Sequence, residues 1–363
     1  MKILIIGDKF PDARVEKTIL SAVKFGYDVG IAYWGTFNPI FDELNSLPHW
    51  QFTMGAKEQM GITSKASIQT LSKIVNDFKP DLLHANDIFN ARIAAELNIK
   101  MIYDDHEFWS DYLKYERSTA SYLSLQKYRR TFGLFFRKRN VKKWENKVLK
   151  KSTIICTCEA MAEHHKKYAK NVFIIPNVPS KREILYLSKL TTEERDKNLL
   201  AFIGDDISKG GGDMRKMKNI LPIIEKSNRK IMVIGDPDLK SNNYVNSIGY
   251  IPHMEIYKQL LKAGIGLIGY EEHPHHKYNS ANKMYMYAHC GLYNIITHQI
   301  DHKDLKYFST FKDYDELLGL LKSDINFDPQ EIIDHARQYL VWENYEENIN
   351  KAYKVEFNET KTM

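Results

Sequence analysis

Met1-Lys2-Ile3-Leu4-Ile5-Ile6-Gly7 opens the chain with a short apolar run that stops at Gly7-Asp8. The run predicts a buried first strand. Further runs rich in Ile and Val alternate with segments of helical period, which is typical of strand-helix units packed as a parallel sheet. Six such strands predict one doubly wound α/β domain in the first half of the chain. They are residues 3–6, 28–33, 82–84, 101–103, 153–156 and 172–175.

The second half of the chain repeats this layout. Its predicted strands are 199–203, 230–234, 247–250, 265–268 and 293–297. The stretch 181–197 is polar and lacks strand character, so we place a domain boundary beside it. We therefore expect two Rossmann-like domains, 1–180 and 181–340. Ligands of such domains lie at the carboxyl ends of the strands, which for two facing domains is a central cleft.

Composition agrees with a folded two-domain protein. The chain has 363 residues, 43% of them hydrophobic and 27% charged, and it exceeds the size at which one core usually keeps growing. The first apolar run is too short for a signal peptide, and no stretch approaches the roughly 20 apolar residues of a spanning helix. The three cysteines, Cys156, Cys158 and Cys290, form no disulfide framework and no four-ligand zinc spacing. A cytoplasmic location fits best.

Two turns of the second half are suited to an anion. One is Gly204-Asp205-Asp206-Ile207-Ser208-Lys209-Gly210-Gly211-Gly212, where glycines permit close backbone approach and Lys209 supplies a charge. Alone it could be only a flexible turn. The other, Ser280-Ala281-Asn282-Lys283, begins an apolar helix that Ser280 or Asn282 could cap. Two lysine-bearing turns, each after a strand, favour a diphosphate over a merely capped helix.

The ordered motifs of the chain resemble those of the GT-B glycosyltransferases of the family 4 type. In the second half the similar segments are 204–210, 249–252 with 257–268, and Asn282-Lys283-Met284-Tyr285-Met286-Tyr287 through Gly291. In the first half they are Asp12-Ala13-Arg14-Val15-Glu16-Lys17, Tyr103-Asp104-Asp105-His106-Glu107 and Ile175-Pro176-Asn177. The resemblance covers most of the chain, and it implies that a terminal helix, 340–355, packs back on the first domain.

The resemblance implies transfer of a sugar from a nucleotide-diphosphate sugar to a glycan, polysaccharide precursor or lipid-linked acceptor, with retention and without a required metal or other cofactor. His106, Lys209 and Lys283 would be catalytic, His106 near the reacting carbon and the lysines on the diphosphate. The donor would bind the domain 181–340, and the acceptor the domain 1–180. The expected donor-binding residues are Gly204, Gly210, Ile251, Pro252, Glu271, Glu272, Tyr278, Ser280, Ala281 and Asn282. The expected acceptor-side residues are Asp12, Arg14, Asp105 and Glu107.

One position departs from the family pattern. Met286 stands where the family has a Glu that accepts hydrogen bonds from the ribose, and a thioether is a poor acceptor. Tyr278 stands where the wider family often has a second Glu. One possibility is that another group holds the ribose, with Glu271 and Glu272 as the candidates. The other is that donor binding is weakened or lost. A noncatalytic binding or assembly subunit and a nucleotide-sugar epimerase therefore remain alternatives.

Other features have a structural reading beside the functional one. His106 could be a histidine tied to neighbouring carboxylates. The segment 271–276 contains histidines and acids but lacks metal-ligand spacing, so a flexible loop is favoured. Cys156 and Cys158 predict core packing. The basic, aromatic run 127–151 is either a helix at an anionic membrane surface or a solvated helix with its aromatics in the core. No motif supports a nucleic-acid partner.

Overall fold

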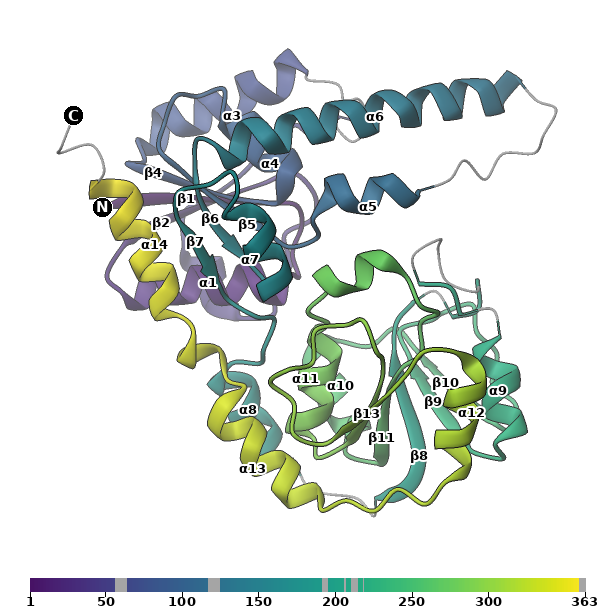
Figure 1. Ribbon diagram of the computed structural model, residues 1–363. Helices are drawn as coiled ribbons and strands as arrows, with labels where there is room; N and C mark the ends of the chain where they lie inside the picture. The colour runs from purple at the N-terminus through teal and green to yellow at the C-terminus, as the bar shows by residue number, and fades with distance from the viewer. Residues whose placement is uncertain are drawn as a thin grey trace. The chain divides into compact units, whose positions relative to one another are not determined.

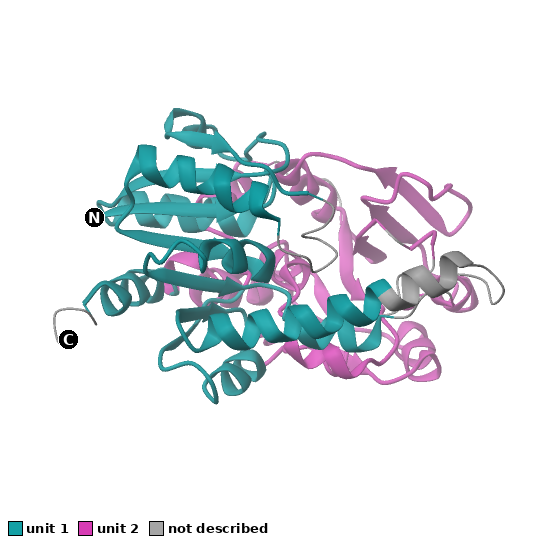
Figure 2. Cartoon of the chain, turned by 90° about the horizontal axis from the view of Figure 1, so that it is seen from above, with its two compact units in different colours: residues 1–176, 345–363 teal, residues 177–344 magenta. Residues whose placement is uncertain are grey.

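A computed structural model of the chain describes residues 1–55, 64–116, 125–190, 195–205, 207–209, 215–217 and 219–358, without the side chains of 125–132. The chain divides into two compact units, one of residues 1–176 with 345–363 and one of residues 177–344 (Figure 1, Figure 2). Each unit is built on its own parallel sheet. This confirms the predicted α/β class of two Rossmann-like domains. In the part of the chain that is described, no helix is long and apolar enough to cross a membrane.

The first unit contains a seven-stranded sheet in the order β3-β2-β1-β4-β5-β6-β7. Residues 3–6 of the central strand β1 are fully buried, because neighbouring strands and packed helices exclude water from them. The predicted count of six strands is wrong by one. The additional strand, β3, has only three residues and pairs on one side with β2, so it lacks the apolar run that marks buried strands. The strands are β1 Lys2–Gly7, β2 Asp28–Tyr33, β3 His49–Gln51, β4 Leu82–Asn86, β5 Met101–Asp105, β6 Thr153–Cys156 and β7 Val172–Ile174.

Helices of the first unit include the last helix of the chain. In α14, Glu356 accepts a hydrogen bond from the backbone N–H of Thr153 in β6 at 3.0 Å, and Asn348 donates one to Ile174 O of β7 at 3.0 Å. These hydrogen bonds hold α14 against the sheet of the first unit. The helices are α1 Ala13–Lys24, η1 Asp42–Ser46, α3 Lys65–Phe78, α4 Asp87–Ala94, α5 Trp109–Tyr115, α6 Leu125–Leu149, α7 Glu159–His165 and α14 Glu347–Asn358.

The second unit contains a six-stranded sheet in the order β10-β9-β8-β11-β12-β13. Here too one strand was not predicted. The edge strand β13 pairs only with β12, and its central Ser309 and Thr310 are polar. The strands are β8 Asp196–Ile203, β9 Ile231–Ile234, β10 Val245–Gly249, β11 Ala263–Ile268, β12 Tyr293–Thr297 and β13 Phe308–Phe311.

The polar stretch 181–197 begins shortly after the point at which the two units divide, between residues 176 and 177. It contains α8 and the beginning of β8, both in the second unit. Ser180 and Glu183 form a capping box at the start of α8, and Glu183 also accepts a hydrogen bond from Tyr257 Oη at 2.9 Å. The helices of this unit are α8 Lys181–Ser188, α9 Ile220–Lys226, α10 His253–Leu260, η2 Pro274–Tyr278, α11 Asn282–His289, α12 Tyr314–Lys322, α13 Pro329–Tyr339 and η3 Trp342–Asn344.

Gly266 of β11 permits α11 to pack on the sheet. A Cβ atom at this position would lie 2.2 Å from Cδ2 of Tyr287, a fully buried ring. We expect Gly266→Ala to lower the free energy of unfolding by about 1–3 kcal/mol, the usual cost of overpacking. In the control Gly319→Ala, on α12, the new Cβ meets nothing within 4 Å. Chemical denaturation that shows equal stability for the two variants would contradict this packing.

Candidate functional site

Two side chains of α11 hold the end of β8. Tyr287 Oη accepts from the N–H of Ile203 at 3.1 Å, and Lys283 Nζ donates to Ile203 O at 2.7 Å. The two side chains are four residues apart, so they leave the same face of α11. The first turn of α11 therefore lies at the carboxyl edge of the second sheet, where doubly wound folds bind ligands.

Lys283 is a half-buried cation that has no acidic partner among the described residues. Its Nζ also donates to Tyr270 Oη at 2.6 Å, and it lies 4.9 Å from the ring centre of Phe202 and 5.1 Å from that of Tyr270. Neutral oxygens and ring faces thus hold the ammonium group without compensating its charge. A cation in this state, in the first turn of a helix, is well suited to bind an anion.

The predicted cap of α11 is wrong. The N-cap residue is Ala281, and no side chain caps this helix. Ser280 is buried and hydrogen-bonds instead with Tyr285 Oη at 3.2 Å, while Asn282 is exposed. Asn177 donates to Ser280 O at 3.1 Å and so fixes the turn. The turn leads into α11 without a side-chain acceptor at the helix end.

Ser208, in the turn after β8, is held by Asp236, a residue that the sequence analysis missed. The buried carboxylate of Asp236 accepts hydrogen bonds from Ser208 N at 2.7 Å and from Ser208 Oγ at 2.9 Å. Burial acts to raise the pKa of Asp236, but these bonds outweigh it and lower that pKa. The only signal in the sequence is an acid directly after the strand β9 and Gly235.

Lys209, in this turn, is more exposed than Lys283 and has an acidic partner. Its side chain is 66% exposed, and its Nζ lies 3.0 Å from Asp238 Oδ2. Gly204 begins the turn and donates to Ile234 O at 2.9 Å. Gly210, with its neighbours at 211–214, lies outside the described residues. Of the two predicted lysines, Lys283 is the one without an acidic partner in the described part of the chain.

The remaining donor-side residues follow the ends of two strands, β10 and β11. Ile251 and Pro252 come after β10, half-buried and exposed respectively, and Pro252 precedes the first residue of α10. Tyr278 is half-buried and ends η2. Glu271 is half-buried and its N–H donates to Lys216 O at 2.9 Å. Glu272 is exposed and accepts from Gln299 Nε2 at 2.6 Å.

In the first unit His106 belongs to a buried charge network at the end of β5. Its Nε2 lies 3.4 Å from Asp104 Oδ1, and its backbone N–H donates to Asp87 Oδ1 at 3.3 Å. Burial opposes a charged imidazole, but Asp104 and Asp87 outweigh it and raise the pKa of His106 to about 9. His106 is therefore an imidazolium at neutral pH. Asp87, which sequence reasoning missed, directly follows β4 with a left-handed φ of 59°.

Two of the predicted acceptor-side residues, Asp12 and Arg14, make contacts within the first unit. Arg14 is buried, with Nη2 2.9 Å from Asp104 Oδ1 and Nη1 donating to Ile175 O at 2.7 Å. Asp12 caps α1 by accepting from the N–H of Arg14 and Val15. The guanidinium of Arg14 thus joins β5 to Ile175, and its role beside an acceptor stays a prediction. Its partners lie 90 and 161 residues away, beyond the reach of local patterns.

The other two predicted acceptor-side residues differ from each other. Asp105 is fully buried, accepts from Phe108 N at 3.0 Å and lies 2.8 Å from His165 Nε2. It orders the turn that follows β5. Glu107 is exposed beside His106, so of the pair only Glu107 is accessible to a ligand.

Comparisons with known proteins agree with this architecture. The model of Glycosyltransferase Family 4 matches residues 22–178. Sucrose-phosphate synthase from Thermosynechococcus elongatus is similar over 98% of this chain and 99% of its own, with a TM-score of 0.68 and 12% identity. The chain has the GT-B fold. A second GT-B structure, the Anabaena protein Alr3699/HepE in complex with UDP and glucose, gives a TM-score of 0.61 at 14% identity over 98% and 100% of the two chains.

A third GT-B structure, WaaG, is a glycosyltransferase involved in lipopolysaccharide biosynthesis. It gives a TM-score of 0.60 at 12% identity over 98% of this chain and 99% of its own. Among curated protein sequences, nothing matches the chain. At these identities the solved structures establish the fold and not the chemistry.

Met286 remains the main departure from the family 4 pattern within this GT-B fold. It is 4% exposed, in the middle of α11. Glu272 is already hydrogen-bonded to Gln299, and His298 Nε2 lies 3.8 Å from it. Glu271 lies close enough to Tyr314 to act on that hydroxyl, whose pKa is raised by burial and by this carboxylate. Both glutamates follow β11, at the same edge as Lys283.

The histidine-rich segment of this GT-B chain is ordered rather than a flexible loop. Residues Pro274–Tyr278 form η2, in which His275 and His276 are buried. Within the described residues no group of histidines, cysteines and acids has the arrangement of a metal site. Cys156 and Cys158 are both buried, as predicted, although Cys158 is the N-cap of α7 and not part of a strand.

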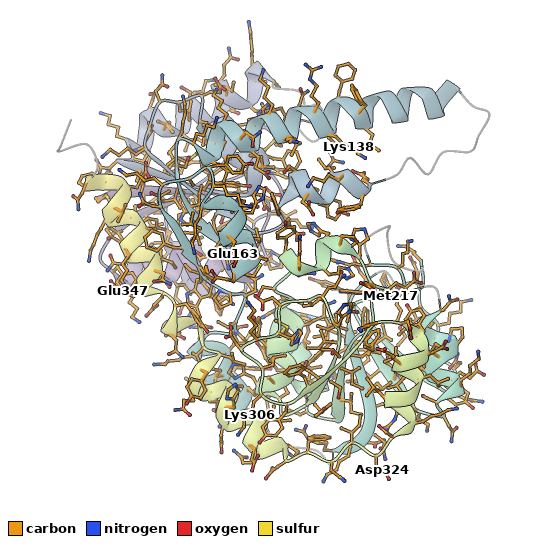
Figure 3. All side chains as sticks on the ribbon, viewed as in Figure 1. Lys138, Glu163, Met217, Lys306, Asp324 and Glu347 are labelled. Carbon is orange, nitrogen blue, oxygen red and sulfur yellow. The ribbon has the colours of Figure 1, made fainter. Side chains whose placement is uncertain are left out.

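The basic run divides between two faces of α6. Val141, Glu145 and Val148 are buried, and Arg137 contacts Glu116 at 3.3 Å. Lys138 projects toward α5, where its Nζ donates to Lys114 O and to Glu116 O (Figure 3). The exposed face contains two aromatic residues and three cations at helical spacing, Phe135, Phe136, Arg139, Lys142 and Lys143. The buried face confirms that part of the run packs on the protein, and a role of the exposed face at a membrane stays a prediction.

Proposed function

We propose that the protein is a glycosyltransferase that moves a sugar from a nucleotide-diphosphate sugar to a glycan, a polysaccharide precursor or a lipid-linked acceptor, with retention at the anomeric carbon. The observation that carries the proposal is the cation of Lys283 at the carboxyl edge of the second sheet, whose partners among the described residues are neutral oxygens and ring faces. The donor binds to the second unit and the acceptor to the first.

The chemistry assigned to these residues is charge stabilisation. When the bond between the anomeric carbon and the diphosphate breaks, negative charge grows on the departing phosphate. Lys283 and the first amides of α11 neutralise that charge, and fixed charges of this kind usually make the largest catalytic contribution. Lys209 provides a second, exposed cation for the diphosphate. To bind it, the ammonium group leaves Asp238 and pairs with a phosphate oxygen instead. His106, charged at neutral pH, contacts the sugar near the reacting carbon.

The solved relatives support the substrate classes. The Anabaena GT-B protein was crystallised with UDP and glucose, and WaaG acts in lipopolysaccharide biosynthesis. A nucleotide-sugar donor and a glycan or lipid-linked acceptor are therefore the classes to assay first.

The proposal is tested by incubating the protein with UDP-, GDP-, ADP-, CMP- and dTDP-sugars, with and without glycan or lipid-linked acceptors. Release of the nucleotide that depends on an acceptor supports a glycosyltransferase. Conversion of the donor without an acceptor identifies an epimerase. Buried Met286 favours the noncatalytic alternative, which becomes the better account if no donor in the panel binds or reacts.

We further propose that α6 docks on the anionic inner face of a membrane. Its face of Phe135, Phe136, Arg139, Lys142 and Lys143 combines large apolar side chains with cations, and Phe135 is 58% exposed. The one acid of α6 within 133–149, Glu145, is buried on the opposite face. Apolar insertion and attraction to acidic headgroups act together on such a surface. It would bring the enzyme to a lipid-linked acceptor.

We expect the double variant Lys142→Ser/Lys143→Ser to bind anionic vesicles less tightly by about 2 kcal/mol, at about 1 kcal/mol per cation near the surface. Vesicle flotation at low and high salt measures this. The matched control is Lys65→Ser/Lys73→Ser, two exposed cations of α3, which should leave binding unchanged. Equal binding to neutral and anionic vesicles, or equal losses in both variants, would show that α6 is only a solvated helix.

A further inference from the structure

A chain of buried contacts joins the C-terminal helix to His106. Tyr353 Oη of α14 lies 2.8 Å from His84 Nδ1, and His84 Nε2 lies 3.4 Å from Asp104 Oδ2. The other oxygen of Asp104 faces both Arg14, at 2.9 Å, and His106 Nε2, at 3.4 Å. Tyr353 and His84 are fully buried and Asp104 is 1% exposed, so water does not compete for these contacts.

The charges around His84 fix the direction of its hydrogen bonds. The charged groups that face it are Asp104, Arg14 and His106. Burial lowers the pKa of His84, Asp104 opposes this, and the two cations that already face Asp104 lower that pKa further. A neutral imidazole has one donor and one acceptor nitrogen.

The acceptor-only carboxylate of Asp104 then requires the proton of His84 on Nε2. Nδ1 of His84 is left as an acceptor, so the Tyr353 hydroxyl donates to it. Each group of the chain orients the next one. The carboxylate of Asp104 is thereby held from both sides, with one oxygen toward His84 and the other toward Arg14 and His106.

We propose that Tyr353 is a positioning residue for His106, acting through His84 and Asp104. The inference rests on the proposed function only for its effect on turnover, because its effect on the imidazoles exists without any substrate. It also gives α14 a role beyond packing. In this proposal a residue of α14 orients His106 through His84, which lies 269 residues before Tyr353 in the sequence.

The test compares Tyr353→Phe with Tyr27→Phe in the full-length protein. Tyr27 is the matched control, because its hydroxyl donates to Asn350 of the same helix at 2.7 Å and its ring packs edge-on against Tyr353. It has no part in the chain to Asp104. Nitrogen-15 NMR of labelled histidines reports the tautomer of His84 and the titration of His106, whose signals are assigned with His84→Gln and His106→Gln. The charged groups around His106 are Asp104, Asp87, Asp8 and Arg14, and His84 is its neutral titratable neighbour.

In Tyr353→Phe we expect Nδ1 of His84 to lose its hydrogen bond, seen as a shift of its nitrogen-15 signal, and His106 to titrate at a lower pH. We also expect kcat to fall about fivefold to tenfold with an unchanged KM for the donor, the size of effect of one neutral hydrogen bond. Tyr27→Phe should change none of these. If His84 and His106 titrate alike in both variants, the proposal is wrong, even if kcat falls. If no donor is turned over, the NMR result still decides the chain of contacts, and only the proposed function fails.

Discussion

Replacement of Lys283 by Ala is expected to weaken binding of a nucleoside diphosphate by about 1.5–3 kcal/mol, roughly tenfold to a hundredfold in Kd, as for the loss of a charged hydrogen bond. The ammonium group is held at the end of β8 by Ile203 O and Tyr270 Oη, so a ligand phosphate meets a cation that is already in place. Isothermal titration calorimetry on the wild type and the variant measures the loss.

The control for this prediction is Lys277→Ala, an exposed lysine of η2 six residues before Lys283 whose Nζ lies 4.9 Å from the ring centre of Tyr278. Its removal changes the net charge by the same amount. Similar losses in the two variants would mean that general attraction, and not a site, explains the binding. Lys209→Ala should have a smaller, more salt-dependent effect, because Lys209 is exposed and already pairs with Asp238.

Replacement of His106 by Gln is expected to lower kcat by about a hundredfold, the typical loss for one fixed group that stabilises developing charge. The charged imidazole is also expected to set a limit on the pH range. Since the folded pKa of His106 is raised to about 9, the imidazolium persists through neutral pH and is lost as the pH rises through that value. Activity of the wild type should therefore fall above about pH 9.

A second variant separates this limit from a general loss of structure. Asp87→Asn removes one carboxylate beside His106 while retaining a residue that tolerates the left-handed conformation found there. The alkaline fall in activity should move to lower pH in this variant. A pH profile of kcat that is the same in wild type and Asp87→Asn would contradict a catalytic imidazolium.

Local patterns were sufficient for the buried strands, because a parallel strand covered by its neighbours must be a continuous apolar run. The runs at 3–6, 153–156 and 265–268 lie in β1, β6 and β11. The edge strands β3 and β13 escaped prediction because each pairs on one side only and carries polar residues.

The site residues show a different limit of sequence reasoning. Lys283 could be named from its helix-opening turn, a local feature. The burial of Arg14 against Asp104 and Ile175, and the contact of His84 with Tyr353, join residues 90 to 269 positions apart. No periodicity encodes such partners. The same applies to Asp236, whose partner Ser208 lies 28 residues away in another strand-helix turn.

The central claim is that Lys283 and the first turn of α11 receive a donor diphosphate. A crystal structure of the protein with the nucleotide that binds most tightly in the titration panel tests it most directly. The account predicts diphosphate oxygens within hydrogen-bond distance of Lys283 Nζ, at the carboxyl end of β8. A nucleotide bound elsewhere, with Lys283 still held only by Ile203 O and Tyr270 Oη, would contradict it.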